Sequence, residues 1–83
     1  MYIKYKILKI ENDIYTVAYC VSRLEPLDGL VKVPMNDSKK TAYIVKKSDS
    51  DWGTIYNGLA AKIRFNKEYK EIPLNEVRTI AFG

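Results

Sequence analysis

Apolar and polar residues alternate along the first part of the chain. Across residues 2–10, apolar side chains alternate with Lys4 and Lys6, which is the period-two pattern of a strand with one buried face. Residues 14–21 are largely apolar at both the odd- and the even-numbered positions, which predicts a central strand covered on both faces. The Glu-Asn-Asp sequence of residues 11–13 favours a turn that tolerates left-handed backbone. These two strands are therefore expected to form an antiparallel hairpin.

The rest of the chain continues with short strand-like segments. Further strands are predicted at residues 30–35, 41–47, 59–65, 69–72 and 77–82. Residues 54–58 fit either a helical turn or a short strand, and no segment has a convincing amphipathic helical pattern. The pattern predicts an all-β domain: a small antiparallel barrel of SH3-like or OB-like type with six or seven short strands. Closure into a barrel would remove the exposed edges of so small a sheet.

Length and composition restrict the class of protein. The chain has 83 residues, which we interpret as a single domain, and a formal net charge of +4, which favours a polyanionic partner without requiring one. The single cysteine, Cys20, lies in an apolar strand and is expected to be a packed thiol in a reducing compartment. No apolar run reaches the roughly 20 residues of a membrane span, and no signal-peptide pattern is present. We expect a cytoplasmic protein that does not associate with membranes.

The residues needed for catalysis or metal binding are poorly represented. There is no histidine, the commonest general base and metal ligand, and there is no glycine-rich phosphate loop. Asp49 and Asp51 lack the loop length, the glycine and the terminal glutamate of a calcium loop. The carboxylates lie mostly in predicted turns, without an acid–base pair. The sequence therefore predicts a protein that is not an enzyme and has neither a cofactor nor a metal site.

Two segments resemble a known DNA-binding domain. Residues 31–36 (VKVPMN), followed by a basic turn and residues 41–45 (TAYIV), resemble the V-R-V-P-F-G run and the apolar strand of one bacterial family. Residues 72–78 (IPLNEVR) are similar to that family's L-P-L-N-E-L-K stretch. The family is the amino-terminal DNA-binding domain of the primosomal replication-restart helicase PriA. Residues 51–70 look like an insertion relative to that domain.

The resemblance implies a binding function and a set of residues. In the family, this domain captures the 3′ end of a DNA strand in a pocket made by an aromatic–acidic pair, a glycine and a lysine. These positions fall on Tyr15, Thr16, Asn36 and Arg78. Tyr15 keeps the aromatic ring and Arg78 keeps the positive charge, whereas Thr16 and Asn36 depart from the pattern. The resemblance implies affinity for nucleic acid, with single-stranded DNA or DNA ends favoured, and no ATP-driven activity, because the helicase motor is absent.

Other basic and aromatic residues extend this hypothesis. Lys39, Lys40, Lys62 and Arg64 are of the type that neutralises phosphates, and Tyr43 is of the type that stacks on unpaired bases. Lysines at turns and strand ends also serve simply to keep sheet edges in water, so both interpretations stay open. The candidate nucleic-acid-binding residues are Tyr15, Thr16, Asn36, Lys39, Lys40, Tyr43, Lys62, Arg64 and Arg78.

A second hypothesis is a protein–protein interaction module, or a small inhibitor from a mobile element that acts on a nucleic-acid enzyme. Trp52 and Tyr56 would be its partner-binding anchors, since tryptophan and tyrosine are enriched among the residues that dominate interface energies. Trp52 alternatively covers the open end of the barrel, and this is the interpretation we favour. A third hypothesis is a subunit that assembles by strand pairing. The sequence does not identify the partner or the oligomeric state.

Overall fold

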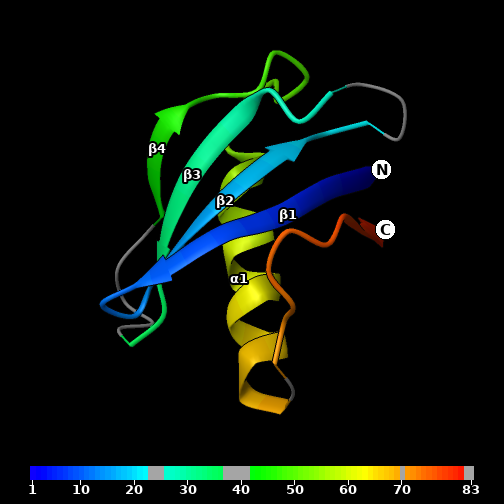
Figure 1. The fold of residues 1–83 in the computed structure, drawn as a ribbon. Helices are drawn as coiled ribbons and strands as arrows, with labels where there is room; N and C mark the ends of the chain where they lie inside the picture. Colours follow the sequence, from blue (N-terminus) through cyan, green and yellow to red (C-terminus); the bar gives the residue numbers. More distant parts are fainter. Residues whose placement is uncertain (23–25, 37–41, 70, 82–83) are drawn as a thin grey trace.

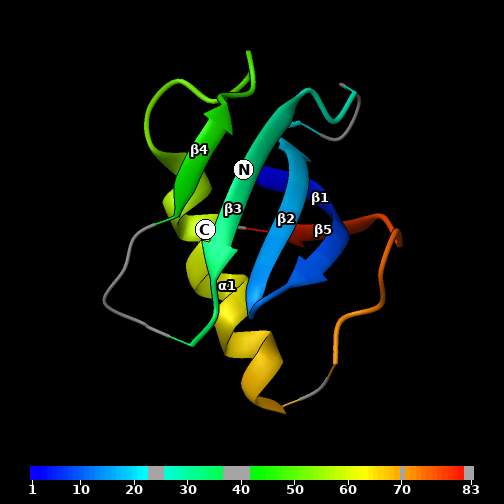
Figure 2. The ribbon, with the colours of Figure 1, turned by 60° about the vertical axis from the view of Figure 1, so that its left-hand side comes forward.

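Five antiparallel strands and one helix make up the part of the chain that is described. The structure is a computed structural model that describes residues 1–22, 26–36, 42–69 and 71–81. Its elements are β1 (Tyr2–Glu11), β2 (Ile14–Cys20), β3 (Gly29–Pro34), β4 (Tyr43–Lys46), α1 (Ile55–Tyr69) and β5 (Arg78–Ala81). Both ribbon views show α1 on one side of the sheet (Figures 1 and 2).

The sheet has the order β4-β3-β2-β1-β5, and every neighbouring pair is antiparallel. The predominantly β architecture is confirmed, and the first three strands match their expected bounds to within one residue. Among the described residues, however, β4 and β5 are free edges, so the sheet is open and has five strands. The expected closed barrel with six or seven strands is not what this part of the chain forms.

The first hairpin turns as its sequence predicts. Asn12 and Asp13 have φ values of 52° and 60°, so both central residues of the two-residue turn are left-handed. A two-residue turn in which both residues are left-handed is of type I′, and its twist matches that of the two paired strands. Asn and Asp tolerate this backbone better than most residues do.

Residues 59–65, which were expected to form a strand, are helical. Leu59 and Ile63 are fully buried against the sheet, and their spacing of four residues fits one face of a strand as well as one face of a helix. The burial of the residues around Leu59 and Ile63 distinguishes a helix from a strand. Ala60 is buried, while Phe65, which the strand pattern placed inside, is 59% exposed. Residues 54–58, left open between turn and strand, contain the start of α1.

The main core lies between α1 and the face of the sheet that it covers. It contains Ile3, Tyr5, Ile7, Tyr15, Val17, Tyr19, Val31, Val33, Leu59 and Ile63. On the opposite face of β2, Ala18 and Cys20 are also buried, which confirms β2 as a central strand. The Cys20 thiol is buried and outside any disulfide, with its sulfur 3.2 Å from the Ser22 carbonyl oxygen. No helix in residues 1–22, 26–36, 42–69 and 71–81 is long and apolar enough to cross a membrane.

Candidate functional site

The sheet has a second face, opposite α1, that carries every lysine of the described strands. Residues paired across an antiparallel ladder share a face, so the register shows which side chains lie together. Lys9, Thr16, Lys32 and Tyr43 form one row across β1 to β4. At the inter-strand spacing of about 4.8 Å, this row is about 14 Å long.

Two further rows lie beside the first. Lys6, Ala18, Leu30 and Lys46 are paired in the second row, and Lys4 is paired with Cys20 and Thr79 in the third. We call this surface the lysine face and define it by Lys4, Lys6, Lys9, Lys32 and Lys46, together with Thr16 and Tyr43. Among the described strand residues, Glu11 is the one carboxylate on the same face. Five ammonium groups therefore share a sheet face that no described helix covers.

Two register shifts bring lysines to this face. The pairing of β1 with β2 shifts between Ile7 and Lys9, so that Lys9 is opposite Thr16; unbroken alternation would place Lys9 on the core side. A second shift between β3 and β4 leaves Val45 as the extra residue and pairs Lys46 with Leu30. Each bulge thus moves one positive charge from the α1 side of the sheet to the lysine face.

A small pocket opens where the first row reaches the β1–β2 turn. It has a volume of about 80 Å³ and is lined by Lys9, Glu11, Asn12, Ile14, Thr16 and Lys32. The Lys9 ammonium lies 3.9 Å from the Glu11 carboxylate, and both side chains are largely exposed. An exposed pair at this distance contributes little to stability, so both groups remain able to respond to a ligand.

The four residues implied by the PriA resemblance do not meet on one face. Tyr15 is 3% exposed and pairs with Val33 in the core, whereas its neighbour Thr16 lines the pocket on the lysine face. Arg78 pairs with Tyr5 on the core side of β5, where its guanidinium lies 3.3 Å from Glu76. Burial raises the pKa of the Tyr5 hydroxyl, and Arg78 opposes that rise. Asn36 is exposed just beyond β3.

The remaining cationic candidates lie elsewhere. Lys62 and Arg64 are on α1, on the other side of the sheet from the lysine face, and the Arg64 guanidinium donates to the Pro34 carbonyl at 2.9 Å. Lys39 and Lys40 lie outside the described residues. Tyr43, 50% exposed, is the one aromatic candidate that lies on the lysine face.

The two partner-binding candidates differ in exposure. Trp52 is 74% exposed in the loop before α1, so the expectation that it covers the end of a barrel is wrong. Trp52 directly follows Asp51, whose carboxylate holds the start of α1. Tyr56 is half-buried and packs against the core from the first turn of α1.

A polar network fixes the start of α1 to β2. The Asp51 carboxylate, 4% exposed, accepts hydrogen bonds from the Tyr19 hydroxyl at 2.8 Å and from the amides of Gly53, Ile55 and Tyr56 at 2.9, 3.2 and 3.2 Å. The Ser48 amide donates to the Tyr19 hydroxyl at 3.2 Å. The network satisfies amides that the first turn of a helix leaves without partners. Its role is structural, because it holds α1 against the core face.

Burial and hydrogen bonding move the pKa values of this network in opposite directions. Burial, reinforced by the Asp51 carboxylate, raises the pKa of the Tyr19 hydroxyl far above its ordinary value. Burial would also raise the pKa of Asp51, but the hydrogen bonds from Gly53, Tyr19, Ile55 and Tyr56 outweigh it and hold that pKa below its ordinary value. Asp51 is therefore ionised and Tyr19 protonated across the neutral range.

Tyr19 predicts a loss of stability at alkaline pH. The unfolded chain releases the tyrosine proton near pH 10, before the folded chain does, so the free energy of unfolding should fall as pH rises above about 10. The slope for one proton is at most about 1.4 kcal/mol per pH unit. Urea unfolding at pH 8, 10 and 11.5 measures this, and Tyr19→Phe should reduce the slope. A slope that is unchanged in Tyr19→Phe would contradict the assignment.

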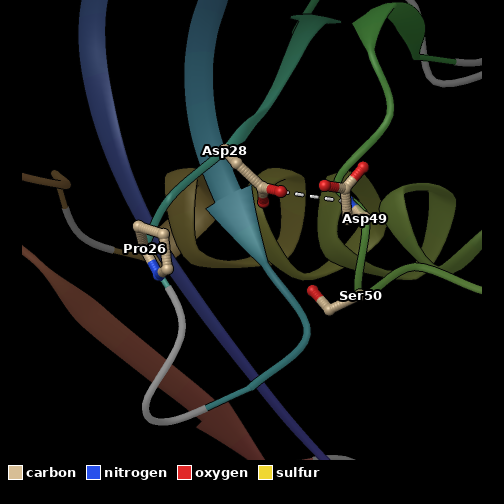
Figure 3. A pocket seen from close by; sticks show the side chains of 4 residues that line it. All are labelled: Pro26, Asp28, Asp49 and Ser50. Atoms are coloured by element: carbon tan, nitrogen blue, oxygen red, sulfur yellow. Dashed lines mark hydrogen bonds between the residues drawn. The ribbon is translucent and has the colours of Figure 1, made fainter.

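A larger cavity of about 290 Å³ lies at the far end of the sheet from the β1–β2 turn, lined by Pro26, Asp28, Asp49 and Ser50 (Figure 3). Asp28 accepts a hydrogen bond from the Ser48 hydroxyl at 2.6 Å and from the Asp49 amide at 3.1 Å, and these bonds lower its pKa. Within the described residues, no three His, Cys, Asp or Glu side chains are grouped as metal ligands. The hydrogen bonds of Asp28 hold the loop after β4 against the start of β3.

Part of the lysine face can be predicted from the sequence. Lys4 and Lys6 alternate with buried Ile3 and Tyr5, so their shared face follows from the period-two pattern. Lys9 breaks that alternation, and only the register shift places it beside them.

Neither a scan of protein-family models nor searches of curated proteins and of solved structures give a match to this chain. We therefore infer function from the chain's own surface.

Proposed function

We propose that this protein is a non-enzymatic nucleic-acid-binding domain that takes single-stranded nucleic acid, DNA in the first place, across its lysine face. The observation that carries the proposal is the grouping of five lysines in three adjacent rows on the sheet face opposite α1. The preference for DNA comes from the resemblance to the primosomal domain. A reducing, cytoplasmic setting fits the buried thiol of the single cysteine, Cys20.

The chemistry of the face suits a single strand. Lysines that neutralise phosphates release condensed counterions, which supplies affinity that does not depend on sequence. Tyr43 ends the row that contains Lys9 and Lys32, and its half-exposed ring offers a stacking surface at the edge of the sheet. Stacking of a base on an aromatic ring is worth about 1–3 kcal/mol and requires an unpaired base. The combination of a basic surface with an aromatic ring favours single strands over duplexes.

One lysine of the face, Lys46, has a carboxylate neighbour outside the strands. Lys46 lies close enough to Asp28 to lower the pKa of that carboxyl, so part of its charge is already balanced. Lys6 and Lys32 lie on neighbouring rows, in the two strands on either side of β2. Replacing both therefore tests the lysine face on each side of its central strand.

Binding should weaken with salt and with the loss of Lys6 and Lys32. Fluorescence anisotropy of a short labelled oligothymidylate measures the affinity over a range of salt concentrations. Five phosphate contacts would give a slope of log K against log salt of about −3.5, and Lys6→Gln/Lys32→Gln should make it shallower by about 1.4 units. Affinity for the double variant at low salt should fall at least tenfold.

Lys62→Gln/Arg64→Gln is the matched control, because it removes the same charge from α1 on the opposite side. It should change the slope far less than the lysine-face pair does. An equal change would move the interface to the helix. Affinity that does not vary with salt would overturn the proposal and favour a protein partner, for which the exposed Trp52 is the prominent anchor.

A further inference from the structure

Strand β4 forms one edge of the sheet, and all its side chains are exposed. Among the described strands it pairs with β3 alone (Figure 2). Tyr43, Ile44 and Val45 are three consecutive large apolar residues with exposed fractions of 50%, 39% and 56%. The outer side of an edge strand presents backbone donors and acceptors with which a further strand can pair. β4 is therefore a place where the sheet can be extended.

The other edge, β5, offers much less to an added strand. Its one large apolar residue, Ile80, packs against the core, and its exposed positions are Thr79 and Ala81. A strand added there would remove little apolar surface from water, and such burial is the main favourable contribution to most protein association. The comparison favours β4 as the edge that binds a partner.

We infer that β4 binds an extended segment of a partner protein in which acidic and apolar residues alternate. Tyr43 and Lys46 lie on the lysine face, whereas Ile44 pairs with the buried Val31 on the side of α1. Successive side chains of an added strand point to these same two faces. Carboxylates suit the lysine face, and apolar groups suit the half-exposed Ile44. The inference goes beyond the proposed function and does not depend on it.

Charge decides between an acidic strand and a second copy of this chain. The face that an added strand would extend contains five lysines and, among the described strand residues, one carboxylate, Glu11. Asp28 balances part of the charge of Lys46 but lies outside the strands. Opposite charges on neighbouring strands are stabilising, and like charges directly opposite each other are destabilising. An acidic strand is favoured over a second β4, which would bring another lysine face to the same edge.

The bulge in β4 makes the pairing selective. The register shift leaves Val45 as an extra residue, and bulges and lysines at an edge discourage pairing with arbitrary strands. β4 has four residues, so it offers a ladder of about 14 Å. Backbone hydrogen bonds would supply part of the affinity, and the match of alternate side chains would supply the specificity. So small an interface is expected to give a weak, reversible complex.

Three peptides of the same composition test the inference. The probe is acetyl-EVEIEV-amide. One control, acetyl-EEEVIV-amide, lacks the alternation, and the other is the probe with every backbone nitrogen methylated, which cannot donate to an edge. In amide NMR titrations of the whole chain, the probe should shift the resonances of residues 43–46 and leave those of β5 unchanged. Its affinity should exceed that of each control about tenfold, because pairing requires both the ladder and the alternation.

Lys46→Glu should lower the affinity for the probe about fivefold and raise that for acetyl-KVKIKV-amide. Lys62→Glu is the matched control, because it makes the same charge change on α1, and it should alter neither affinity. Equal binding of the probe and either control peptide would overturn the inference, as would no shift at millimolar probe. Self-association through residues 43–46 would overturn it in favour of a second copy. No nucleic acid is present in these titrations, so the inference and the proposed function can fail separately.

Discussion

Replacing Asp51 by Ala should lower the free energy of unfolding by about 3 kcal/mol, the first of the two largest effects expected from a single change. The carboxylate accepts from three amides at the start of α1 and from the buried Tyr19 hydroxyl. Loss of a helix-capping side chain costs about 0.5–2 kcal/mol, and a buried donor left without a partner costs about 1–3 kcal/mol. A domain of 83 residues has roughly 4–12 kcal/mol of total stability. The urea midpoint, followed by circular dichroism, measures the change.

Asp49→Ala is the control for this prediction, because it removes an exposed carboxylate two residues away in the same loop. It should change stability by less than about 0.5 kcal/mol, as surface substitutions usually do. An equal loss in both variants would mean that loop charge, and not the hydrogen-bond network, stabilises the start of α1.

The dependence of stability on acidic pH gives a second, independent test of the role of Asp51. Its pKa is held below the ordinary value in the folded chain, so its contribution is fully present above about pH 4 and is lost as pH falls below that value. The free energy of unfolding of the parent protein should therefore fall between pH 4 and pH 2. Asp51→Ala should show a smaller fall over the same range, because the group that takes up the proton on unfolding has been removed.

The same network keeps α1 on the side of the sheet opposite the lysine face. Tyr19 and Asp51 hold α1 against one face of the sheet, where Leu59 and Ile63 complete the core. The opposite face of β2 carries small residues, Ala18 and Thr16, between the lysines of the flanking strands. Ala18 and Thr16 are themselves 6% and 8% exposed, so the groups that a ligand could reach on this face are the side chains of the flanking strands.

Patterns between neighbouring residues in the sequence predicted the parts of the fold that depend on those neighbours alone. Alternation along β1 and the Asn12–Asp13 turn were sufficient for the first hairpin, because each depends on neighbours in sequence. The helix was not predicted, since Leu59 and Ile63 satisfy both periodicities and α1 is stabilised by tertiary packing against the sheet. Closure of the sheet depends on long-range pairing of the last strand, which no local pattern encodes.

The candidate site was predictable to a similar extent. Alternation in β2 by itself places Tyr15 and Thr16 on opposite faces, which is where the structure has them, so a pocket shared by both side chains would require a bulge. Thr16, a candidate from the resemblance, lines the small pocket, and Tyr43, a candidate because of its aromatic ring, lies on the lysine face. The contribution of Lys9 and Lys46 depends on two register shifts, and bulges leave no clear signal in a single sequence.

Gly29→Ala should be as damaging as the loss of Asp51, at about 3 kcal/mol, although it adds only one methyl group. Gly29 pairs with Tyr19 across β3 and β2, and the tyrosine ring lies over the glycine. A Cβ at residue 29 would contact the ring at Cε1 and, at 2.6 Å, at Cδ1, and would lie 2.9 Å from the Ser48 Cβ. Overpacking of a well-packed core typically costs about 1–3 kcal/mol. Gly53→Ala is the control, because a Cβ there meets nothing within 4 Å.

The cost at Gly29 depends on the ring being unable to move away. The Tyr19 hydroxyl is held by the Asp51 carboxylate and the Ser48 amide, so the ring cannot swing without breaking both hydrogen bonds. Tyr19→Phe removes that restraint while keeping the ring. The double variant Gly29→Ala/Tyr19→Phe should therefore be more stable than the sum of the single changes predicts, by about 1 kcal/mol in a double-mutant cycle of urea unfolding. Strict additivity would show that the clash is relieved by the backbone of β3, and that the network does not determine how closely β2 and β3 approach.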